Sequence, residues 1–246
     1  MAIDPRLRAL ARRLIELSAS LTGTTIGVAT REPAVALSFD DGPDPEWTPR
    51  FAELLEAHGA RGTFFLVGKS AAAHPELLER LAEGGHALAN HTWDHPSLPT
   101  LRGRYRRTQL RWCRQALGRH DSGLFRPPYG HQTLLSQLDA TLLGYRVVTW
   151  NAIAEDWLAD PPEQLVARVE RRLGPGSIVL FHDRLYTTVD PAFSDRTPTL
   201  AAVEMLLARH AGRYRFVTVP ELLRLGPARK WHHYQRPDLD WLHRLS

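Results

Sequence analysis

The 246-residue chain lacks several features on which whole classes of protein depend. Its only cysteine is Cys113, so an internal disulfide is impossible, and a structural zinc site built on two or more thiolates is excluded. No stretch approaches the roughly 18 uninterrupted apolar residues of a membrane-spanning helix. Internal repeats and low-complexity tracts are absent from the sequence as well. What remains is the composition of a globular protein, with a length that suits one large domain or two small ones.

Lysine is also scarce, because Lys69 and Lys230 are the only two and arginine supplies nearly all of the 31 cations. The formal net charge of +4 and the pI of about 9.6 raise the question of a nucleic-acid partner. The arginines, however, run along the whole chain and are mixed with 27 acidic residues, whereas a nucleic-acid footprint needs clustered charge. We therefore predict that the protein does not bind nucleic acid.

The first 21 residues do not have the pattern of a signal peptide, because Arg12, Arg13 and Glu16 interrupt the apolar core that export requires. Instead, leucines recur at helical spacing from Leu7 to Leu17 with arginines between them, which predicts an amphipathic cationic helix. We favour packing of its apolar face on its own domain over peripheral contact with an anionic membrane, which such a helix also permits. The expected location is the cytoplasm or the membrane periphery, and the oligomeric state is not indicated.

Short apolar segments alternate with segments of helical periodicity through the rest of the chain. The predicted strands are Ala34–Asp40, Gly62–Val67, His86–Asn90, Leu124–Arg126, Tyr145–Trp150, Ser177–Phe181 and Tyr214–Val219. The predicted helices are Trp47–His58, Pro75–Glu83, Leu101–Leu117, Thr133–Leu143, Pro162–Leu173 and Leu200–His210. Apolar strands separated by helices indicate a parallel sheet covered by helices. About seven such units fit either a closed or nearly closed β/α barrel or an open doubly wound sheet.

Polar and titratable residues follow the predicted strands at the points where these end. They form five clusters: DDGP at 40–43, HTWDH at 91–95, RPPYG at 126–130, DW at 156–157 and HD at 182–183. In a β/α fold the C-terminal ends of the strands share one face, and that face holds the active site. Each cluster alone also fits an ordinary solvent-exposed turn, but the convergence of five predicts a catalytic site.

His91 and His95 can bind one ion, since neutral imidazole nitrogens are common ligands of zinc and other borderline divalent metals. Pro96 disfavours helical geometry at His95, so we expect the two histidines on a turn. With one aspartate of the Asp40–Asp41 pair, the site has three protein ligands and keeps positions open for water, as a catalytic metal site requires. Two surface histidines in a loop are the simpler alternative.

Arg126 and His182 both follow apolar segments directly. An arginine buried at that point would need a carboxylate partner, for which Asp40 and Asp156 are candidates. His182 emerges from the core and titrates near neutrality, so it can exchange protons in catalysis. A surface arginine and a core histidine with satisfied hydrogen bonds are the alternatives.

The motifs FDDGP, HTWDH, RPPYG, DW and IVLFH, in this order and spacing, resemble the five motifs of the polysaccharide deacetylases, the NodB-homology enzymes of carbohydrate esterase family 4. The resemblance covers roughly Pro33 to Val219. It implies an α/β fold, a distorted (β/α) barrel with about seven parallel strands. It also implies substrates that are N-acetylated, and sometimes O-acetylated, sugars of chitin, peptidoglycan, xylan and related glycans.

The resemblance further implies roles for individual residues. Asp41, His91 and His95 match the ligands of a divalent metal, usually Zn²⁺, with Co²⁺, Ni²⁺ or Mn²⁺ also accepted. Asp40 matches the general base, and Arg126 matches the residue that holds this base.

The other side of the site is assigned from the same resemblance. The backbone N–H of Tyr129 matches an oxyanion donor. His182 matches the general acid, and Asp156 matches the carboxylate that tunes this acid. Trp157 and Leu180 match the walls of the acetyl pocket.

The expected organisation of the chain has three parts. Residues 1–32 hold the N-terminal amphipathic helix and its lead-in, residues 33–226 the deacetylase barrel, and residues 227–246 an aromatic and basic segment. Because this last segment is rich in tryptophan, tyrosine and histidine, we expect it to form a helix or an arm that packs on the domain.

We therefore predict a metal-dependent hydrolase that removes the acetyl group of an N-acetylated sugar in an oligosaccharide, glycan or glycoconjugate. The alternatives are an O-acetyl esterase, or a deformylase or deacetylase of a lipid-linked or small amino-sugar precursor, and the missing export signal favours an intracellular substrate. A glycan-binding protein without catalysis is a further reading. A phosphatase is disfavoured, because Asp40, Asp41 and Gly42 do not give the D-x-D spacing of a nucleophilic aspartate. Asn151 stands where many family members have another aspartate, so the fourth motif depends on its Asp-Trp pair alone.

Overall fold

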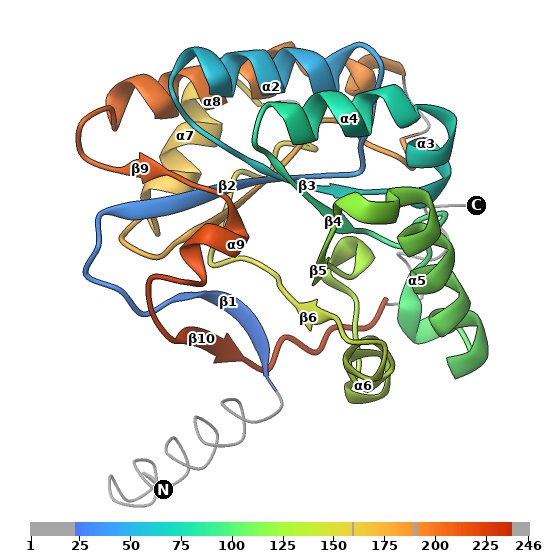
Figure 1. Ribbon diagram of the computed structural model, residues 1–246. Coiled ribbons are helices and arrows are strands. Elements are labelled where there is room, and N and C mark those ends of the chain that lie inside the picture. Colours follow the sequence, from blue (N-terminus) through green and yellow to red (C-terminus); the bar gives the residue numbers. More distant parts are fainter. Residues whose placement is uncertain (1–22, 159, 189–190, 238–246) are drawn as a thin grey trace, which may run out of the picture.

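The computed structural model describes residues 23–158, 160–188 and 191–237 (Figure 1). All ten of the expected site residues lie within these ranges, whereas the helix expected in Met1–Leu21 lies outside them. In the described part of the chain, no helix combines the length and the hydropathy that crossing a membrane requires.

A curled, open half-barrel of parallel strands forms the centre of the molecule (Figure 1). Seven strands follow one another in the order β6-β5-β4-β3-β2-β8-β7, and every neighbouring pair is parallel, while β9 adds an eighth strand beside β2. The bounds are β2 (Ala34–Asp40), β3 (Thr63–Leu66), β4 (Ala87–Asn90), β5 (Asp121–Phe125), β6 (Arg146–Val147), β7 (Ala152–Ile153), β8 (Ile178–His182) and β9 (Arg215–Phe216). The expected distorted (β/α) barrel of about seven parallel strands is confirmed.

The central strand β2 is buried along its whole length. Its side chains alternate between two apolar layers, as successive side chains of a strand must. Phe39 stacks with Phe64 and Phe181 in the larger layer, whereas Ala36 packs with Phe65 in the smaller one. A strand that is covered on both faces has to be apolar throughout, which is why this segment is easy to recognise in the sequence.

Helices cover the outer face of the sheet and enclose the larger apolar layer with α2, α4, α7 and α8 (Figure 1). The helix bounds are α2 (Trp47–Ala57), α3 (Gly68–Ala73), α4 (Pro75–Glu83), α5 (Gly103–Leu117), α6 (Leu134–Leu142), α7 (Pro162–Glu170), α8 (Thr197–Arg209) and α9 (Val219–Leu222). Short 3₁₀ segments occupy Leu98–Thr100, Gly118–His120, Pro128–Gly130 and Pro191–Ser194. All six helices expected from the sequence are present, and the short α3 and α9 were not expected.

An antiparallel pair of strands lies apart from the main sheet and was not expected. β1 (Thr24–Val28) pairs with β10 (Ala228–Trp231), so that the two ends of the described chain meet. After β10 the chain continues as an extended arm, whose Gln235 exchanges backbone hydrogen bonds with Gln132.

Two of the expected strands lose most of their predicted length in the structure. Of Tyr145–Trp150 only Arg146 and Val147 belong to β6. Of Tyr214–Val219 only two residues form β9, because Thr218 is the N-cap of helix α9. Its hydroxyl caps the N–H of Glu221, and the Glu221 carboxylate accepts from the N–H of Thr218, which is a capping box that ends the strand.

Candidate active site

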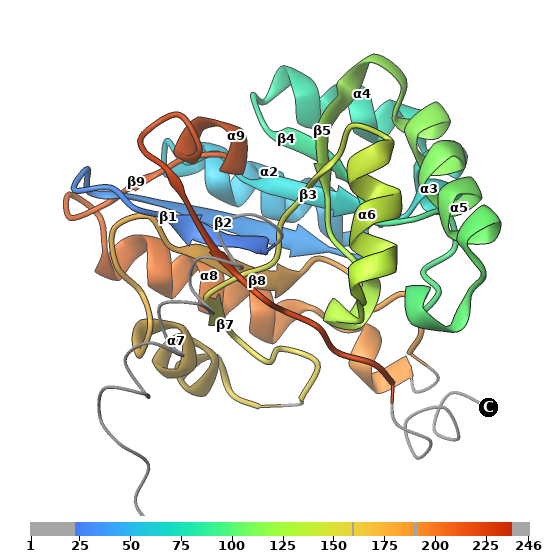
Figure 2. The ribbon, with the colours of Figure 1, turned by 90° about the horizontal axis from the view of Figure 1, so that it is seen from below.

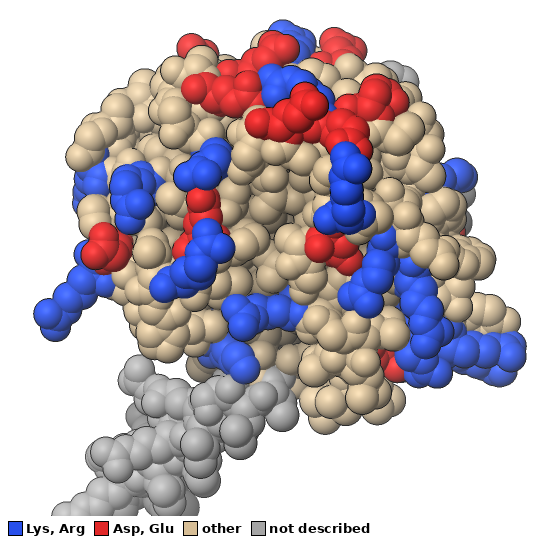
Figure 3. All heavy atoms as spheres, in the orientation of Figure 1, with Lys and Arg blue, Asp and Glu red and all other residues tan. Residues whose placement is uncertain are grey.

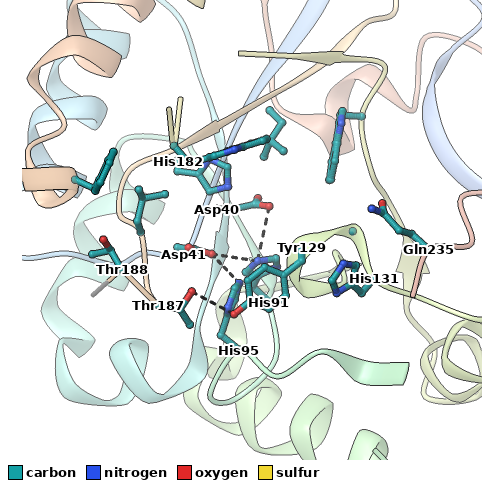
Figure 4. Close-up of a pocket in the computed structure, with 16 residues that line it drawn as sticks. Asp40, Asp41, His91, His95, Tyr129, His131, His182, Thr187, Thr188 and Gln235 are labelled. Atoms are coloured by element: carbon teal, nitrogen blue, oxygen red, sulfur yellow. Dashed lines mark hydrogen bonds and ion pairs between the residues drawn. The ribbon is translucent and has the colours of Figure 1, made fainter. Parts of the chain in front are cut away.

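The expected site residues gather around one cavity of about 490 Å³ at the C-terminal ends of the parallel strands (Figure 4). Eight of the ten line it directly: Asp40, Asp41, His91, His95, Tyr129, Trp157, Leu180 and His182. Arg126 and Asp156 lie behind this wall, each bound to a residue that lines it. The volume is within the range of small-molecule sites, about 300–1,000 Å³.

Asp41, His91 and His95 converge on one point of the cavity wall, and all three are buried. Asp41 Oδ1 lies 3.0 Å from His95 Nε2 and 3.3 Å from His91 Nε2 (Figure 4). One ligand atom from each residue lies within 4.8 Å of the other two. One carboxylate oxygen and two imidazole nitrogens at this separation can hold a divalent metal ion.

The hydrogen bonds around the triad fit a set of metal ligands. His91 Nδ1 is 2.9 Å from the backbone carbonyl of Arg126. Because a carbonyl only accepts, Nδ1 donates to it, and in the neutral imidazole the lone pair of Nε2, which faces Asp41, is then available to a metal. Asp41 Oδ2 accepts from the backbone N–H of Tyr186 at 2.9 Å, whereas Oδ1 is buried and has no hydrogen bond in the described structure. A cation between these atoms would satisfy an oxygen that is otherwise orphaned.

The protonation states of the triad also fit metal binding. Burial opposes the Asp41 carboxylate, but its contacts with His95 and His91 outweigh this effect and hold the pKa of Asp41 well below its ordinary value. Burial lowers the pKa of His95. An ionised carboxylate and a neutral imidazole are the forms that bind metal.

Strained backbone is concentrated at this site. Of the five non-glycine residues with positive φ in the described chain, Asp41 (φ 80°), His95 (φ 61°) and Tyr129 (φ 58°) line the cavity. Such conformations cost of order 1–3 kcal/mol each and cluster where function needs them. At Asp41 the turn re-aims the side chain, so that two consecutive carboxylates, Asp40 and Asp41, face the same cavity instead of opposite sides of a strand.

Asp40 ends β2 and is held by a fully buried arginine. Arg126 Nη1 donates to Asp40 Oδ1 at 2.6 Å, and Nη2 donates to the hydroxyl of Ser38 at 2.9 Å. The guanidinium also lies over the ring of Phe65, 3.9 Å from its centroid. Of the two carboxylates that the sequence offered as partners of Arg126, the structure pairs it with Asp40 and not with Asp156.

His182 ends β8, directly beside Asp40 in the register of β2 and β8. Asp156 Oδ1 lies 2.8 Å from its Nδ1, and Arg196 Nη2 donates to Oδ2 of the same carboxylate at 2.7 Å. Burial opposes the imidazolium, but the charge and the hydrogen bond of Asp156 outweigh it and raise the pKa of His182 to about 9. A proton donor therefore faces the cavity next to a carboxylate that can accept a proton.

The remaining expected residues give the cavity its apolar walls. Trp157 is 40% exposed and meets the ring of His182 edge-on, with centroids 5.6 Å apart. Leu180 is buried on β8. The ring of Tyr129 lies against His95, with centroids 4.4 Å apart. An apolar wall beside an aspartate and a histidine suits a small substituent such as a methyl group.

Comparisons with known proteins identify the family. The polysaccharide deacetylase family model matches residues 27–148, a span that contains Asp41, His91, His95 and Arg126. A peptidoglycan-N-acetylglucosamine deacetylase of Bacillus cereus is 33% identical over 204 residues, which cover 80% of this chain and 70% of the relative. The chain belongs to the polysaccharide deacetylase family. A chitooligosaccharide deacetylase of Azorhizobium caulinodans is also 33% identical, over 168 residues that cover 67% of this chain and 80% of that protein.

Solved structures share the fold of this polysaccharide deacetylase. A family 4 carbohydrate esterase from Streptomyces lividans, in complex with acetate, aligns with a TM-score of 0.68 and 29% identity, over 85% of this chain and 100% of that one. Peptidoglycan deacetylase PdaC from Bacillus subtilis aligns with a TM-score of 0.67 and 28% identity, over 80% and 93% of the two chains. A family 4 pseudoenzyme from Bacillus anthracis, 22% identical with a TM-score of 0.74 over 87% and 74% of the two chains, shows likeness of fold alone. Family and fold are confirmed, and the roles of single residues stay predictions.

Sequence reasoning missed two side chains of this polysaccharide deacetylase that hold the expected ones in place. Arg196 is buried and binds Asp156 through both the carboxylate and the backbone carbonyl. Ser38 lies between Arg126, from which it accepts, and the carbonyl of Val179, to which it donates at 2.6 Å. Nothing in the sequence distinguishes these residues, because arginine and serine occur throughout the chain.

Asp183 was named in the fifth cluster of the sequence, but no role was assigned to it. The carboxyl is fully buried, Thr48 Oγ1 donates to its Oδ2, and its Oδ1 has no hydrogen bond in the described structure. A Cβ at Gly42 would come within 2.8 Å of Oδ1 and closer still to Oδ2, so the carboxyl fills the space below the turn that carries Asp41. Burial raises the pKa of Asp183 to about 7.

Asn151, which stands where many family members have an aspartate, makes two hydrogen bonds to the start of β8. Its Oδ1 accepts from the backbone N–H of Ile178 at 2.9 Å, and its Nδ2 donates to Ser177 Oγ at 3.1 Å. These bonds tie the segment before β7 to the start of β8, at the end of the strand remote from His182.

Proposed function

We propose that the protein is a metal-dependent deacetylase that hydrolyses the acetamide of N-acetylglucosamine units in a glycan of the peptidoglycan or chitooligosaccharide type. The observation that carries this proposal is the placement of Asp40 and His182 as neighbours on β2 and β8, at the cavity that the Asp41–His91–His95 triad also lines. The relatives named for these two substrates support the choice of sugar.

Amide hydrolysis needs help at both reactants, because an amide is a poor electrophile and water a poor nucleophile. A divalent ion held by the triad supplies Lewis acidity when it is bound, and Zn²⁺ suits two imidazoles and one carboxylate. Asp40, held by Arg126, accepts the proton of the attacking water. The backbone N–H of Tyr129 donates to the developing oxyanion, and the loss of one such donor typically costs about 3–4 kcal/mol of transition-state stabilisation.

The amine leaves poorly until it is protonated. His182 enters the reaction as imidazolium, because its pKa is raised to about 9, and it transfers a proton to the departing nitrogen. Burial opposes the Asp156 carboxylate, but His182 outweighs this effect and lowers the pKa of Asp156, so Asp156 remains charged and orients the ring. The C–N bond breaks, and the products are acetate and a free amine. Trp157 and Leu180 enclose the methyl group of the acetyl.

Release of acetate from N-acetylated chitooligosaccharides and peptidoglycan fragments tests this function. Asp40→Asn should lower turnover by about 10²–10⁴-fold, the usual contribution of a general base, while the metal content stays that of the wild type. Asp94→Asn is the matched control, because Asp94 is an exposed carboxylate of the loop that carries the two histidines.

Three results would contradict the proposal. Metal-loaded protein that releases no acetate from any acetylated glycan would indicate a protein without catalysis. Release from O-acetylated sugars alone would indicate an esterase. Loss of metal in Asp40→Asn would mean that the roles of Asp40 and Asp41 are exchanged.

A further inference from the structure

Helix α6 turns its leucines outward and its polar residues inward. Ser136, Gln137 and Asp139 are buried against the domain. The exposed residues form what we call the α6 leucine face: Leu134 (45% exposed), Leu135 (65%), Leu138 (44%) and Leu142 (79%). With 3.6 residues per turn, these four side chains occupy an arc of about 100°. A helix that packs on a globular core shows the reverse arrangement.

Specific contacts fix this orientation of α6. Asp139 accepts from Arg106 Nε at 2.7 Å and from Arg107 Nη1 at 2.6 Å, both on α5. Gln137 Oε1 accepts from the hydroxyl of Tyr234 at 3.1 Å, on the arm that follows β10. The helix therefore lies between α5 and the C-terminal arm (Figure 2), and its leucines face outward because its polar side is used for packing.

The surroundings of the α6 leucine face are strongly basic. Residues 96–154 contain nine arginines and only two acids, Asp121 and Asp139, and both acids are paired with arginines. The even mixture of charge that the whole sequence indicates does not hold for this segment. Within residues 96–154, the exposed arginines for which the described structure shows no ion pair with a carboxylate are Arg102, Arg104, Arg111 and Arg146. Figure 3 shows Lys and Arg on both sides of the lower end of the molecule, where α6 lies.

The opposite end of the molecule is acidic. Glu53 on α2 and Glu76, Glu79 and Glu83 on α4 are exposed, and Asp and Glu gather there at the top of Figure 3. This asymmetry orients the protein in the field of a negatively charged surface, with α6 foremost.

We propose that the α6 leucine face and the arginines around it dock the protein on an anionic lipid bilayer. Leucines that enter the acyl boundary and arginines that meet lipid phosphates are the two contacts by which interfacial helices bind membranes. The charges disfavour two other occupants. A second copy would place the same arginines against each other across a two-fold axis, and residues 1–22, with four arginines and two acids, would meet them with charge of the same sign.

The docking face adjoins the catalytic cavity. His131 and Gln235 line the cavity, Gln132 pairs with Gln235, and α6 begins two residues later at Leu134. A bilayer against α6 therefore lies next to a wall of the cavity, where an acetylated sugar carried on a lipid would be presented. This consequence for the substrate rests on the proposed function, whereas the docking itself does not.

A fluorescent probe on the face tests the docking in the full chain. Cys113 is buried and is the only native cysteine, so Leu142→Cys can be labelled selectively with an environment-sensitive dye. With vesicles that contain phosphatidylglycerol, we expect a blue shift and quenching by a lipid-borne quencher. Vesicles of phosphatidylcholine alone should give neither. The same label at Leu77→Cys, on the acidic side in α4, should respond to neither vesicle.

Substitutions in the labelled protein separate the two kinds of contact. Arg104→Gln with Arg111→Gln should weaken vesicle binding about 25-fold, since each arginine near an anionic surface contributes about fivefold. Leu135→Gln should weaken it about tenfold or more, because it removes the burial of one leucine. Arg171→Gln with Arg172→Gln, an exposed pair at the end of α7, removes the same charge elsewhere and should leave binding unchanged.

Each contrary result overturns the docking proposal. A probe at position 142 that ignores phosphatidylglycerol vesicles would do so directly. A probe that is already in an apolar environment without vesicles would indicate a second copy if the signal depends on protein concentration, and another segment of the same chain, residues 1–22 or 238–246, if it does not. Weakening by the arginine changes but not by Leu135→Gln would mean that vesicle binding is electrostatic alone and that the leucines do not enter the bilayer. None of these measurements uses acetate release, so they remain independent of the proposed enzymatic activity.

Discussion

His182 differs from an ordinary histidine through its surroundings, and its side chain therefore allows a test of the acid step. If it protonates the leaving amine, His182→Ala should slow amide hydrolysis by about 10²–10⁴-fold. Activated acetyl esters have leaving groups that need little protonation, so their hydrolysis should fall much less. Initial rates on an N-acetylated oligosaccharide and an aryl acetate, with the same enzyme preparations, give the comparison. Equal losses on both substrates would remove His182 from the acid role.

The charge state of His182 can be measured directly in metal-free protein. Its pKa is raised from the ordinary 6.5 to about 9 because Asp156 outweighs the effect of burial. Since the shift is upward, the His182–Asp156 pair contributes its full stabilisation below about pH 6.5 and loses it as the pH rises through about 9. Asp156→Asn removes the charge, so the pKa of His182 should fall below its value in the wild type. Titration of the ring by NMR measures both values, and a wild-type pKa at or below 6.5 would contradict this account.

The Asp183 carboxyl lies against Gly42 in the turn that carries Asp41, so we expect Asp183 to support the position of this turn. Asp183→Ala removes the acceptor of Thr48 and leaves a gap under Gly42, so we expect a loss of about 1–3 kcal/mol in the free energy of unfolding. Small displacements of catalytic groups can lower the reaction rate about 100-fold. We therefore expect kcat to fall while KM changes little. Asp183→Asn keeps the shape of the side chain, so it should retain most of the stability and most of the kcat of the wild type. Urea denaturation and acetate release measure the two effects, and wild-type kcat in Asp183→Ala would show that the turn does not depend on this carboxyl.

At the scale of elements, the local sequence pattern was sufficient to predict those strands and helices that are continuously buried. β2, β3, β4 and β8 are apolar because both faces are covered, and α2 and α4 show a helical period that Gly59 and the Gly84–Gly85 pair end. The pairing of β1 with β10 could not be read from the sequence, because its strands are about 200 residues apart and β10 is mostly exposed. The capping box of α9 could in principle have been predicted from Thr218 and Glu221, which are three residues apart. The apolar residues around Thr218 led instead to the prediction of a strand over Tyr214–Val219.

The candidate site also has a part that the sequence predicted and a part that it did not. Nine of the ten expected residues lie at a strand end or in the loop after one, Leu180 lies within β8, and the fold places all ten around or directly behind one cavity. The buried groups that support them, Arg196, Ser38 and Asp183, depend on contacts between distant segments, which residue type and spacing do not encode. The sequence predicted a helix at Thr133–Leu143 but not the outward position of its leucines, because a hydrophobic period does not say which side faces the core.

At the scale of the whole molecule, the metal should stabilise the fold as well as serve the chemistry. Its expected ligands come from the end of β2 and the loop after β4, so they are brought together only in the folded chain. An ion that binds the folded state alone stabilises it by RT ln(1 + [L]/Kd), which is about 2.7 kcal/mol at a concentration of 100 Kd. For a chain of this size, about 2–4 °C per kcal/mol gives a rise in Tm of about 5–10 °C.

Thermal unfolding with Zn²⁺ and after treatment with a chelator measures this difference. His91→Ala should abolish both the bound metal and the rise in Tm, because it removes one of three protein ligands. Asp40→Asn should keep both, since Asp40 is bound to Arg126 and lies outside the triad. If elemental analysis shows that the chelator has removed the metal and Tm does not change, the ion does not bridge these segments. If His91→Ala retains its metal, the ligands lie elsewhere and the assignment of the triad is wrong.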